Sequence, residues 1–368
     1  MNHALIALTV FGVTLGTALC FVSRAIFVAK RLGLLDQPGP RRVHQIAVPR
    51  AGGAAVFLAF TIGVLITFTL DVPRNKPEIE RLVLLLGASA VVTGVMLYDD
   101  IFGMSPFPKL LSQVGAAAIV VLPRIQGPNH GIVINTFNAP LAGEVKLPAI
   151  FAVAFTTFWI VGMMNTINWV DGLDGLASSV TLVACGVLFA HTYFWPRSAP
   201  QFTISLLPLA LAAAVIGFLV FNWYPAKIIL GDAGANFLGF ALAIISIIGG
   251  AKIATALLAL GLPILDVAWV IFYRISHGRA PYTADRGHLH HRLLDAGWTQ
   301  AQIVLFVSGI SAFFGLASLL LSDRVVKAAL IGAVGMILLG TIGVMAIRDR
   351  EKRGLAGDES IKLPHSSS

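Results

Sequence analysis

The chain has 368 residues, of which 57% are hydrophobic and only 12% are charged. A soluble globular domain carries about 25% charged residues, so this composition excludes a water-soluble fold and predicts an integral membrane protein. A net charge of +8 would suggest nucleic-acid binding in a soluble protein. In a membrane protein the excess of basic residues flanks the spans instead, and we expect no nucleic-acid partner.

Long apolar runs, broken by glycine, proline and charge, predict the membrane topology. A spanning helix needs about 20 predominantly apolar residues. Eleven runs of this kind predict an all-α polytopic membrane protein with about 11 transmembrane helices. We expect a single integral-membrane domain over residues 1–347 and a disordered cytoplasmic tail over 348–368. The predicted spans are 4–29, 51–70, 81–98, 107–123, 148–164, 176–194, 202–221, 235–250, 253–275, 301–321 and 328–347.

The basic residues predict the orientation of these spans. If the N-terminus is outside, 17 of the 26 lysines and arginines lie in or beside the cytoplasmic connections. The positive-inside rule therefore favours an outside N-terminus and a cytoplasmic C-terminus. The long outside loop at 124–147 carries Gly, Pro and Asn around the letters IVINTF, and this pattern predicts a small β-hairpin.

Most of the unusual polar residues fall in the loops that are predicted to be cytoplasmic. Asp99 and Asp100 end the third span side by side. Adjacent carboxylates need a cation, a proton or strong hydrogen bonds to coexist. A divalent metal or a phosphate-handling site fits them, because Mg²⁺ prefers carboxylate oxygens together with substrate phosphates. For this pair alone, a solvated loop start is the alternative.

A second polar group follows the fifth span, where Asn165, Asn168, Asp171 and Asp174 recur every three residues. On a helical turn each would neighbour the next along one face. The glycines between them allow a close approach of the backbone to a ligand. Turn and cap chemistry explains one of these residues but not four at a fixed spacing, so we predict a binding face.

A third acidic position, Asp232, lies between glycines at the start of the eighth span. Helix-terminal N–H groups favour anions there, and a simple helix cap is the alternative. Asn222 ends the preceding span, so we expect the two residues to face each other across the loop. Asp266, inside the ninth span, is interpreted as structural, for example as one half of a buried pair.

A histidine-rich loop follows the ninth span. His288, His290 and His291 alternate with arginines that include Arg286 and Arg292. The arginines favour anion recognition over a zinc site, because a guanidinium repels a metal ion and attracts a diphosphate. A basic loop that binds lipid head groups is the alternative.

In combination, the DD pair, NxxNxxDGLDG, NxxPAK with GDAG, and HLHH resemble the polyprenyl-phosphate N-acetylhexosamine-1-phosphate transferase superfamily (glycosyltransferase family 4) over about residues 30–320. The resemblance implies a multi-pass enzyme of the bacterial inner membrane with a cytoplasmic active site. It implies transfer of N-acetylhexosamine-1-phosphate, GlcNAc-1-phosphate first among the candidates, from a UDP-sugar to undecaprenyl or another polyprenyl phosphate. UMP is released, and cell-surface glycan synthesis begins. The implied cofactor is Mg²⁺, with Mn²⁺ as the alternative ion. The implied partners are the lipid, the UDP-N-acetylhexosamine and the bilayer, and a homodimer is left open.

The roles of individual residues also follow from this resemblance. Asp99 matches a carboxylate proposed to deprotonate the lipid phosphate, and Asp100 matches an assisting group, so both are candidate catalytic residues. Asp232 matches the Mg²⁺ ligand, and we place Asp171 with it as a second ligand. The candidate substrate-binding residues are Arg50, Asn168, Asp171, Asp174, Asn222, Arg286, His288, His290 and His291.

Two segments resemble the WecA/TagO-type branch, which initiates surface glycans from UDP-GlcNAc: HQIAVPRAGG and DRGHLHHRLLDAG. The alternative phospho-MurNAc-pentapeptide transferase branch carries a TPTMGG-like segment and three consecutive histidines, where this chain has VPRAGG and HLHH. The chain also has Ala235 and Asn236 where many relatives have Ser-Met, so the sugar stays open. An ion-coupled transporter is a further alternative, although its coupling residues belong near the bilayer midplane. A CDP-alcohol phosphotransferase would need an arginine that DGLDGLASS lacks.

Overall fold

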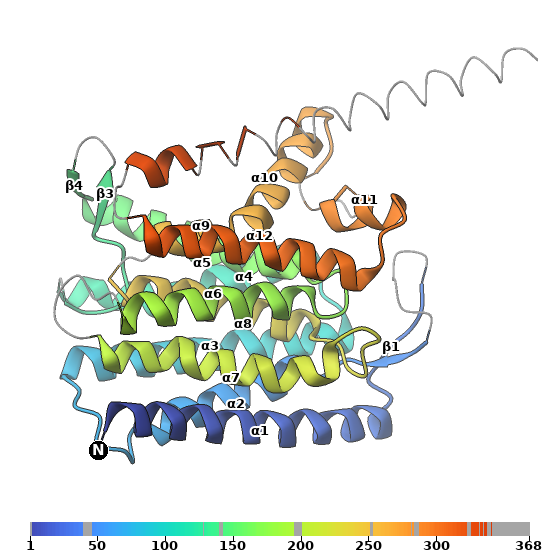
Figure 1. The fold of residues 1–368 in the computed structure, drawn as a ribbon, viewed down its shortest axis with the longest axis horizontal. Coiled ribbons are helices and arrows are strands. Elements are labelled where there is room, and N and C mark those ends of the chain that lie inside the picture. Colours follow the sequence, from blue (N-terminus) through green and yellow to red (C-terminus); the bar gives the residue numbers. More distant parts are fainter. Residues whose placement is uncertain are drawn as a thin grey trace, which may run out of the picture.

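We analysed a computed structural model of the chain, which describes residues 2–39, 46–127, 129–139, 143–194, 201–250, 253–280, 282, 287–321 and 325–330, together with 332, 333, 335, 336 and 340. Within these ranges the protein is a helical bundle whose long helices lie side by side (Figure 1). In chain order the elements are α1 (His3–Leu32), β1 (Leu35–Asp36), β2 (Val48–Pro49), α2 (Gly52–Ile66), α3 (Lys76–Phe102), α4 (Pro106–Val121), the 3-10 helix η1 (Leu122–Gln126), β3 (Thr136–Ala139), β4 (Gly143–Lys146), α5 (Ala149–Val170), α6 (Leu176–Tyr193), α7 (Phe202–Asn222), α8 (Gly231–Ile248), α9 (Ile253–Ala259), α10 (Gly261–Ser276), α11 (Leu289–Asp295) and α12 (Gln300–Leu320).

The predicted all-α membrane fold is confirmed. In the described part of the chain, eight helices are long and apolar enough to cross a membrane: α1, α3, α4 with η1, α5, α6, α7, α8 and α12. The predicted span 51–70 corresponds to α2, whose 15 residues extend about 22 Å, short of a typical hydrocarbon core of about 30 Å. The predicted span 328–347 and the tail at 348–368 fall largely or wholly outside the described residues. The count of eleven and the orientation therefore stay predictions.

The predicted span at 253–275 corresponds to two helices, α9 and α10, which together are long and apolar enough to cross a membrane but meet at an angle of 79°. Pro263 has no N–H to donate to the carbonyl of Ala259, and its ring crowds the preceding turn. Hydrogen bonding resumes only at Ile264, whose N–H donates to Leu260 (2.9 Å). As a result α10 diverges from the neighbouring helices (Figure 1).

The predicted hairpin in the 124–147 loop is confirmed. Strands β3 and β4 pair antiparallel, with Thr136 opposite Lys146 and Ala139 opposite Gly143. Figure 1 places this hairpin and the N-terminus at one end of the bundle, and β1 and α11 at the other. The two ends that the sequence predicts to face opposite sides of a membrane are thus opposite ends of the fold.

Helix α8 is the centre of the bundle. Every residue from Ala233 to Ile248 is buried, as expected for a helix that is apolar on all faces. Small residues let its neighbours approach closely: a Cβ on Gly234 would lie 2.6 Å from the Cα of Gly53, and one on Gly239 would lie 2.5 Å from the carbonyl oxygen of Met163. The first turn of α8 is therefore held in a fixed position.

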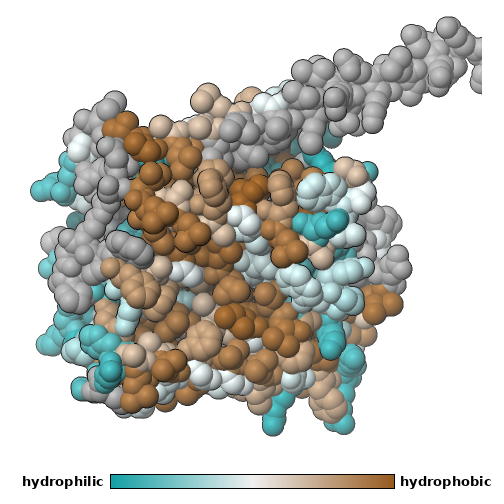
Figure 2. All heavy atoms as spheres, in the orientation of Figure 1, coloured by the Kyte–Doolittle hydropathy of each residue, from teal (hydrophilic) through white to brown (hydrophobic). Residues whose placement is uncertain are grey.

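The outer surface of the bundle is apolar. Figure 2 shows hydrophobic residues across the face between two hydrophilic ends. Large side chains such as Leu8 and Phe158 are more than half exposed. Contiguous exposed apolar surface is unusual for a soluble monomer and is what contact with lipid requires.

Candidate active site

Three carboxylates from two helices come together at the end of the bundle that carries β1 and α11. Asp99 and Asp100 lie in the last turn of α3, and Asp232 lies in the first turn of α8. Each offers one oxygen, and these oxygens lie within 4.8 Å of one another. The candidate catalytic pair and the candidate metal ligand, more than 130 residues apart in the chain, thus form one cluster.

A lysine that the sequence analysis did not select lies between two of these carboxylates. Nζ of Lys109, in the first turn of α4, is 2.6 Å from Oδ2 of Asp99 and 2.7 Å from Oδ2 of Asp232. The sequence signal was weak, because a lone lysine at the start of a span is explained by the positive-inside rule. In the fold it is the ammonium that separates two carboxylates.

Asp100 caps α8. The backbone N–H groups of Asp232 and Ala233 donate to its two oxygens at 2.8 and 3.0 Å, and Nη2 of Arg50 lies 2.8 Å from Oδ1. Gly231 has φ of +73°, and a Cβ there would lie 2.6 Å from Oδ2 of Asp100. The DD pair is therefore divided: Asp100 is engaged by a helix terminus and a guanidinium, whereas Asp99 faces Lys109.

Arg50 is placed by backbone pairing on both of its sides. It follows β2, which pairs with β1, and it forms a parallel bridge with Ile229 just before α8. Its guanidinium reaches Oδ1 of Asp232 (3.3 Å) and Oδ1 of the buried Asp36 (3.4 Å) as well as Asp100. Asp36 is a second residue of the site that sequence reasoning missed, because only the β1–β2 pairing brings it there.

Within the described part of the chain, the three clustered carboxylates Asp99, Asp100 and Asp232 outnumber the two cations that contact them, Arg50 and Lys109. The excess of negative charge and the all-oxygen donor set fit a hard divalent cation such as Mg²⁺.

The predicted helical face that carries Asn165, Asn168, Asp171 and Asp174 is only half correct. Helix α5 ends at Val170, so the two asparagines lie on its last turns and the two aspartates lie in the loop that follows. Gly175, with φ of +77°, takes a conformation that favours glycine. The three-residue spacing therefore does not continue as a helix.

The two loop aspartates have different surroundings. The pKa of Asp171 is raised to about 8 by burial and then by the nearby carboxylates of Asp232 and Asp100. It lies beside the three-carboxylate cluster but is not one of its members. Asp174 instead accepts a hydrogen bond from the N–H of Ala226 (3.0 Å) and thereby joins its loop to the one before α8.

Asn222 ties the same two loops together. It is buried, its Oδ1 accepts from the N–H of Gly175 and from Oγ of Ser178 (both 3.1 Å), and its Nδ2 donates to the carbonyl of Ile228 (3.0 Å). These partners, rather than the expected Asp232, occupy its amide.

The histidine loop begins with a buried pair. Nδ1 of His288 donates to Oδ2 of Asp266 at 2.9 Å, and the N–H of Leu289 donates to Oδ1 at 2.8 Å. Asp266 is therefore one half of a buried pair, and its partner is one of the candidate substrate-binding histidines. The pair fixes the start of α11 against α10.

His290 is buried beneath the loop after α5, and its Nε2 leaves no room for a Cβ on Gly172. Burial, followed by the neighbouring His291 and His288, holds the pKa of His290 well below its usual value. It is therefore neutral at pH 7. Arg286 lies outside the described residues.

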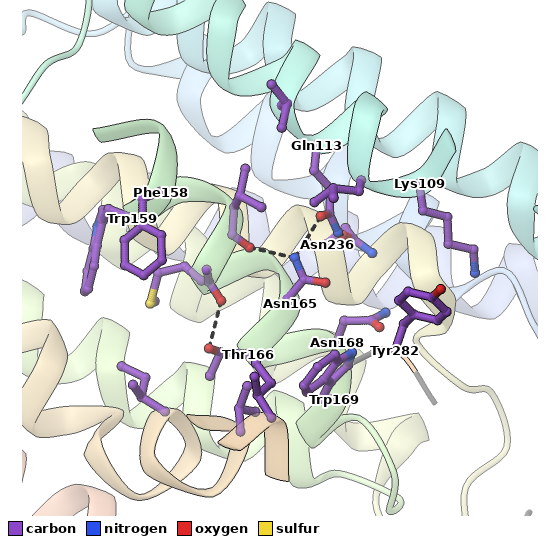
Figure 3. Close-up of a pocket in the computed structure, with 18 of the residues that line it drawn as sticks. Lys109, Gln113, Phe158, Trp159, Asn165, Thr166, Asn168, Trp169, Asn236 and Tyr282 are labelled. Carbon is purple, nitrogen blue, oxygen red and sulfur yellow. Dashed lines mark hydrogen bonds between the residues drawn. The ribbon is translucent and has the colours of Figure 1, made fainter. Parts of the chain in front are cut away.

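A groove of about 1370 Å³ runs from the charged cluster along an apolar part of the bundle surface. Lys109, Asn168 and Asp232 line its charged end, and Phe158 and Trp159 line its apolar part (Figure 3). The diverging α10 forms one wall of this groove, and residues on both sides of the break between α9 and α10 line it. A polar group at one end and a long apolar channel behind it suit a lipid with a charged head.

A band of amides lines the wall between these two parts of the groove. It consists of Gln113, Asn165 and Asn236, which Figure 3 shows close together. The sequence hinted at them only through the asparagine spacing, the unusual Asn236, and a single glutamine in an apolar run.

Comparisons with known proteins agree with this geometry. The sequence pattern of glycosyl transferase family 4 matches residues 82–250. A protein of Bacillus subtilis (strain 168), named a probable undecaprenyl-phosphate N-acetylglucosaminyl 1-phosphate transferase, is 30% identical over 86% of this chain and 85% of its own. The decaprenyl-phosphate N-acetylglucosaminephosphotransferase of Mycobacterium tuberculosis (strain ATCC 25618 / H37Rv) is 30% identical over 86% and 83%. The undecaprenyl-phosphate alpha-N-acetylglucosaminyl 1-phosphate transferase of Escherichia coli (strain K12) is 25% identical over 84% and 82%. With its motifs on one groove and this extent of similarity, the chain belongs to glycosyl transferase family 4.

Proposed function

We propose that this protein transfers GlcNAc-1-phosphate from UDP-GlcNAc to a polyprenyl phosphate in the bacterial inner membrane. The products are polyprenyl-diphosphate-GlcNAc and UMP. One observation carries the proposal: a cluster of carboxylates, paired with the side chains of Arg50 and Lys109, lies at the charged end of an apolar groove. Such a site can hold a water-soluble diphosphate and a lipid phosphate next to each other. The names of the relatives support GlcNAc and a polyprenyl acceptor.

The acceptor lies along the groove. Its polyprenyl chain packs against the apolar part, where Phe158 and Leu257 are among the lining residues. Its phosphate reaches the ammonium of Lys109 at the charged end. An oxygen of this phosphate attacks the β-phosphorus of the donor, the bond from that phosphorus to the UMP oxygen breaks, and the departing UMP takes the electron pair.

Asp232 is the proposed Mg²⁺ ligand, with Asp99 across the Lys109 ammonium and Asp171 beside the cluster as its candidate partners. When bound, the ion offsets the negative charge of the diphosphate, which is the main requirement of phosphoryl transfer. Lys109 contacts both Asp99 and Asp232, the carboxylates that would hold the ion, and its ammonium would then be available to bind the acceptor phosphate. Asp99, buried and already held by the N–H of Met104 (2.6 Å), positions this lysine.

The histidine loop closes the donor side of the site. Because His290 is neutral, it supplies a hydrogen bond rather than a positive charge. Arginine side chains offset the negative charge that develops on the leaving UMP. Nδ1 of His288 is hydrogen-bonded to Asp266, so its other ring nitrogen, Nε2, points away from Asp266. The alternative of an ion-coupled transporter is disfavoured because the ionisable cluster lies at one end of the bundle rather than in its middle.

The test is product analysis with purified protein in neutral detergent. We expect UDP-GlcNAc, undecaprenyl phosphate and Mg²⁺ to yield a lipid diphosphate-GlcNAc, identified by mass spectrometry, with one UMP released per lipid formed. EDTA should stop the reaction. Release of UDP together with a lipid monophosphate sugar, or no product with any UDP-HexNAc, would overturn the proposal.

A further inference from the structure

The amide band forms a layer one helical turn deeper than the charged cluster. Gln113 follows Lys109 by four residues on α4, and Asn236 follows Asp232 by four residues on α8, which corresponds to about 6 Å along each axis. Gln113 and Asn236 are only 4% and 2% exposed, and Asn165 lines the groove beside them.

Hydrogen bonds join these amides in a chain that runs in one direction. Nδ2 of Asn165 donates both to the carbonyl of Val161 (2.9 Å) and to Oε1 of Gln113 (2.8 Å). Nε2 of Gln113 donates to Oδ1 of Asn236 (2.7 Å), and Nδ2 of Asn236 donates to the carbonyl of Asp232 (2.9 Å).

Two backbone carbonyls fix this direction. A carbonyl oxygen only accepts, so the nitrogens of Asn165 and Asn236 must face Val161 and Asp232. Gln113 lies between a donor and an acceptor and can then adopt only one orientation. Turning over any of the three amides would place oxygen against oxygen or nitrogen against nitrogen.

The chain therefore presents one amide oxygen to the groove. Oδ1 of Asn165 receives no hydrogen bond from any residue that the structure describes, and Figure 3 shows it directed away from both bonds of its own nitrogen. It can only accept. Ionised phosphates are themselves acceptors, and a polyprenyl chain is neither donor nor acceptor. The donors that the proposed reaction brings are the hydroxyl and amide N–H groups of the UDP-sugar.

We propose that Oδ1 of Asn165 accepts a hydrogen bond from a hydroxyl or the acetamido N–H of the transferred sugar and thereby determines donor specificity. This inference rests on the proposed function. The sugar is bonded directly to the phosphate that is transferred, next to Lys109 and Asp232, whereas uracil is separated from it by the ribose and a phosphate. Gln113 and Asn236 brace the wall of the groove, whereas the carbonyl of Val161 by itself keeps the nitrogen of Asn165 turned away from the groove.

The experiment compares Asn165→Leu with the matched control Asn236→Leu. Both substitutions preserve shape and break the amide chain, but only the first removes the groove-facing oxygen, since Val161 still anchors the nitrogen of Asn165 in the second. The values of kcat/KM are measured for UDP-GlcNAc and for analogues that each lack one donor: the 3-, 4- and 6-deoxy sugars and an ester in place of the acetamide.

We expect the wild type to discriminate about tenfold or more against one analogue. Asn165→Leu should lose that discrimination, and Asn236→Leu should keep it despite a similar fall in melting temperature. If Asn165→Leu does not fold, Asn165→Ala gives the same measurement. Unchanged discrimination against every analogue would overturn the inference, as would an effect confined to the Mg²⁺ dependence or to uracil analogues. A wild type that forms no lipid product with UDP-GlcNAc would instead refute the proposed function.

Discussion

Removal of the lysine between two carboxylates tests the electrostatics of the site most directly. Lys109→Met keeps the length and packing of the side chain but leaves Asp99, whose side chain is 2% exposed, facing Asp232 without the ammonium. Loss of one partner from a buried ion pair lowers the free energy of unfolding by about 3–5 kcal/mol, and loss from an exposed ion pair lowers it by about 0–1 kcal/mol. The Lys109 side chain is 31% exposed, and Asp99 keeps the N–H of Met104, so we expect a loss of about 2 kcal/mol.

A divalent ion should reverse this loss. An ion that binds only the folded protein adds about 2.7 kcal/mol to the free energy of unfolding at a concentration of 100 Kd. This gain is similar in size to the loss expected from Lys109→Met. Thermal melting in neutral detergent should therefore show Lys109→Met well below the wild type in EDTA and gaining more than the wild type from Mg²⁺. The control is Lys76→Met, which removes an exposed lysine from the other end of α3. It should melt with the wild type in EDTA and gain no more than the wild type from Mg²⁺. A Lys109→Met protein that melts with the wild type in EDTA would refute the proposed role of this lysine.

Three further substitutions probe the supports of the site. His290 has a lowered pKa in the fold, so on acidification below about 6.5 the unfolded chain takes up a proton that the folded protein does not, and stability falls by up to about 1.4 kcal/mol per pH unit. His290→Gln should flatten this fall in melting temperature between pH 7.5 and 5.5, and an equal slope would contradict the burial argument. Gly231→Ala adds about 1–2 kcal/mol of backbone strain and displaces the Asp100 cap, so it should melt lower and lose activity, whereas Gly309→Ala, in open space, should not. Asp266→Asn should raise amide hydrogen exchange in α11 and lower kcat, and unchanged exchange would show that the histidine loop is held by other contacts.

The sequence alone determined the class of the protein and the identity of most candidate residues. Apolar runs are local features, and a bilayer forces each of them to satisfy its own backbone hydrogen bonds as a helix, so the spans could be predicted one at a time. The hairpin at 124–147 followed from turn residues for the same reason. Asp99, Asp100 and Asp232 were found because acidic residues at the ends of apolar runs are unusual.

Only the tertiary structure decided how these residues are combined. No local pattern shows that Lys109 lies between Asp99 and Asp232, or that Asp100 caps a helix that begins more than 130 residues later. The break before Pro263 lies in the wall of the groove, and its angle of 79° depends on the helices against which α9 and α10 pack. The amides of the groove wall acquire their direction only where three helices meet. Contacts between residues far apart in the chain depend on the packing of whole helices, which hydrophobic periodicity and motif spacing do not encode.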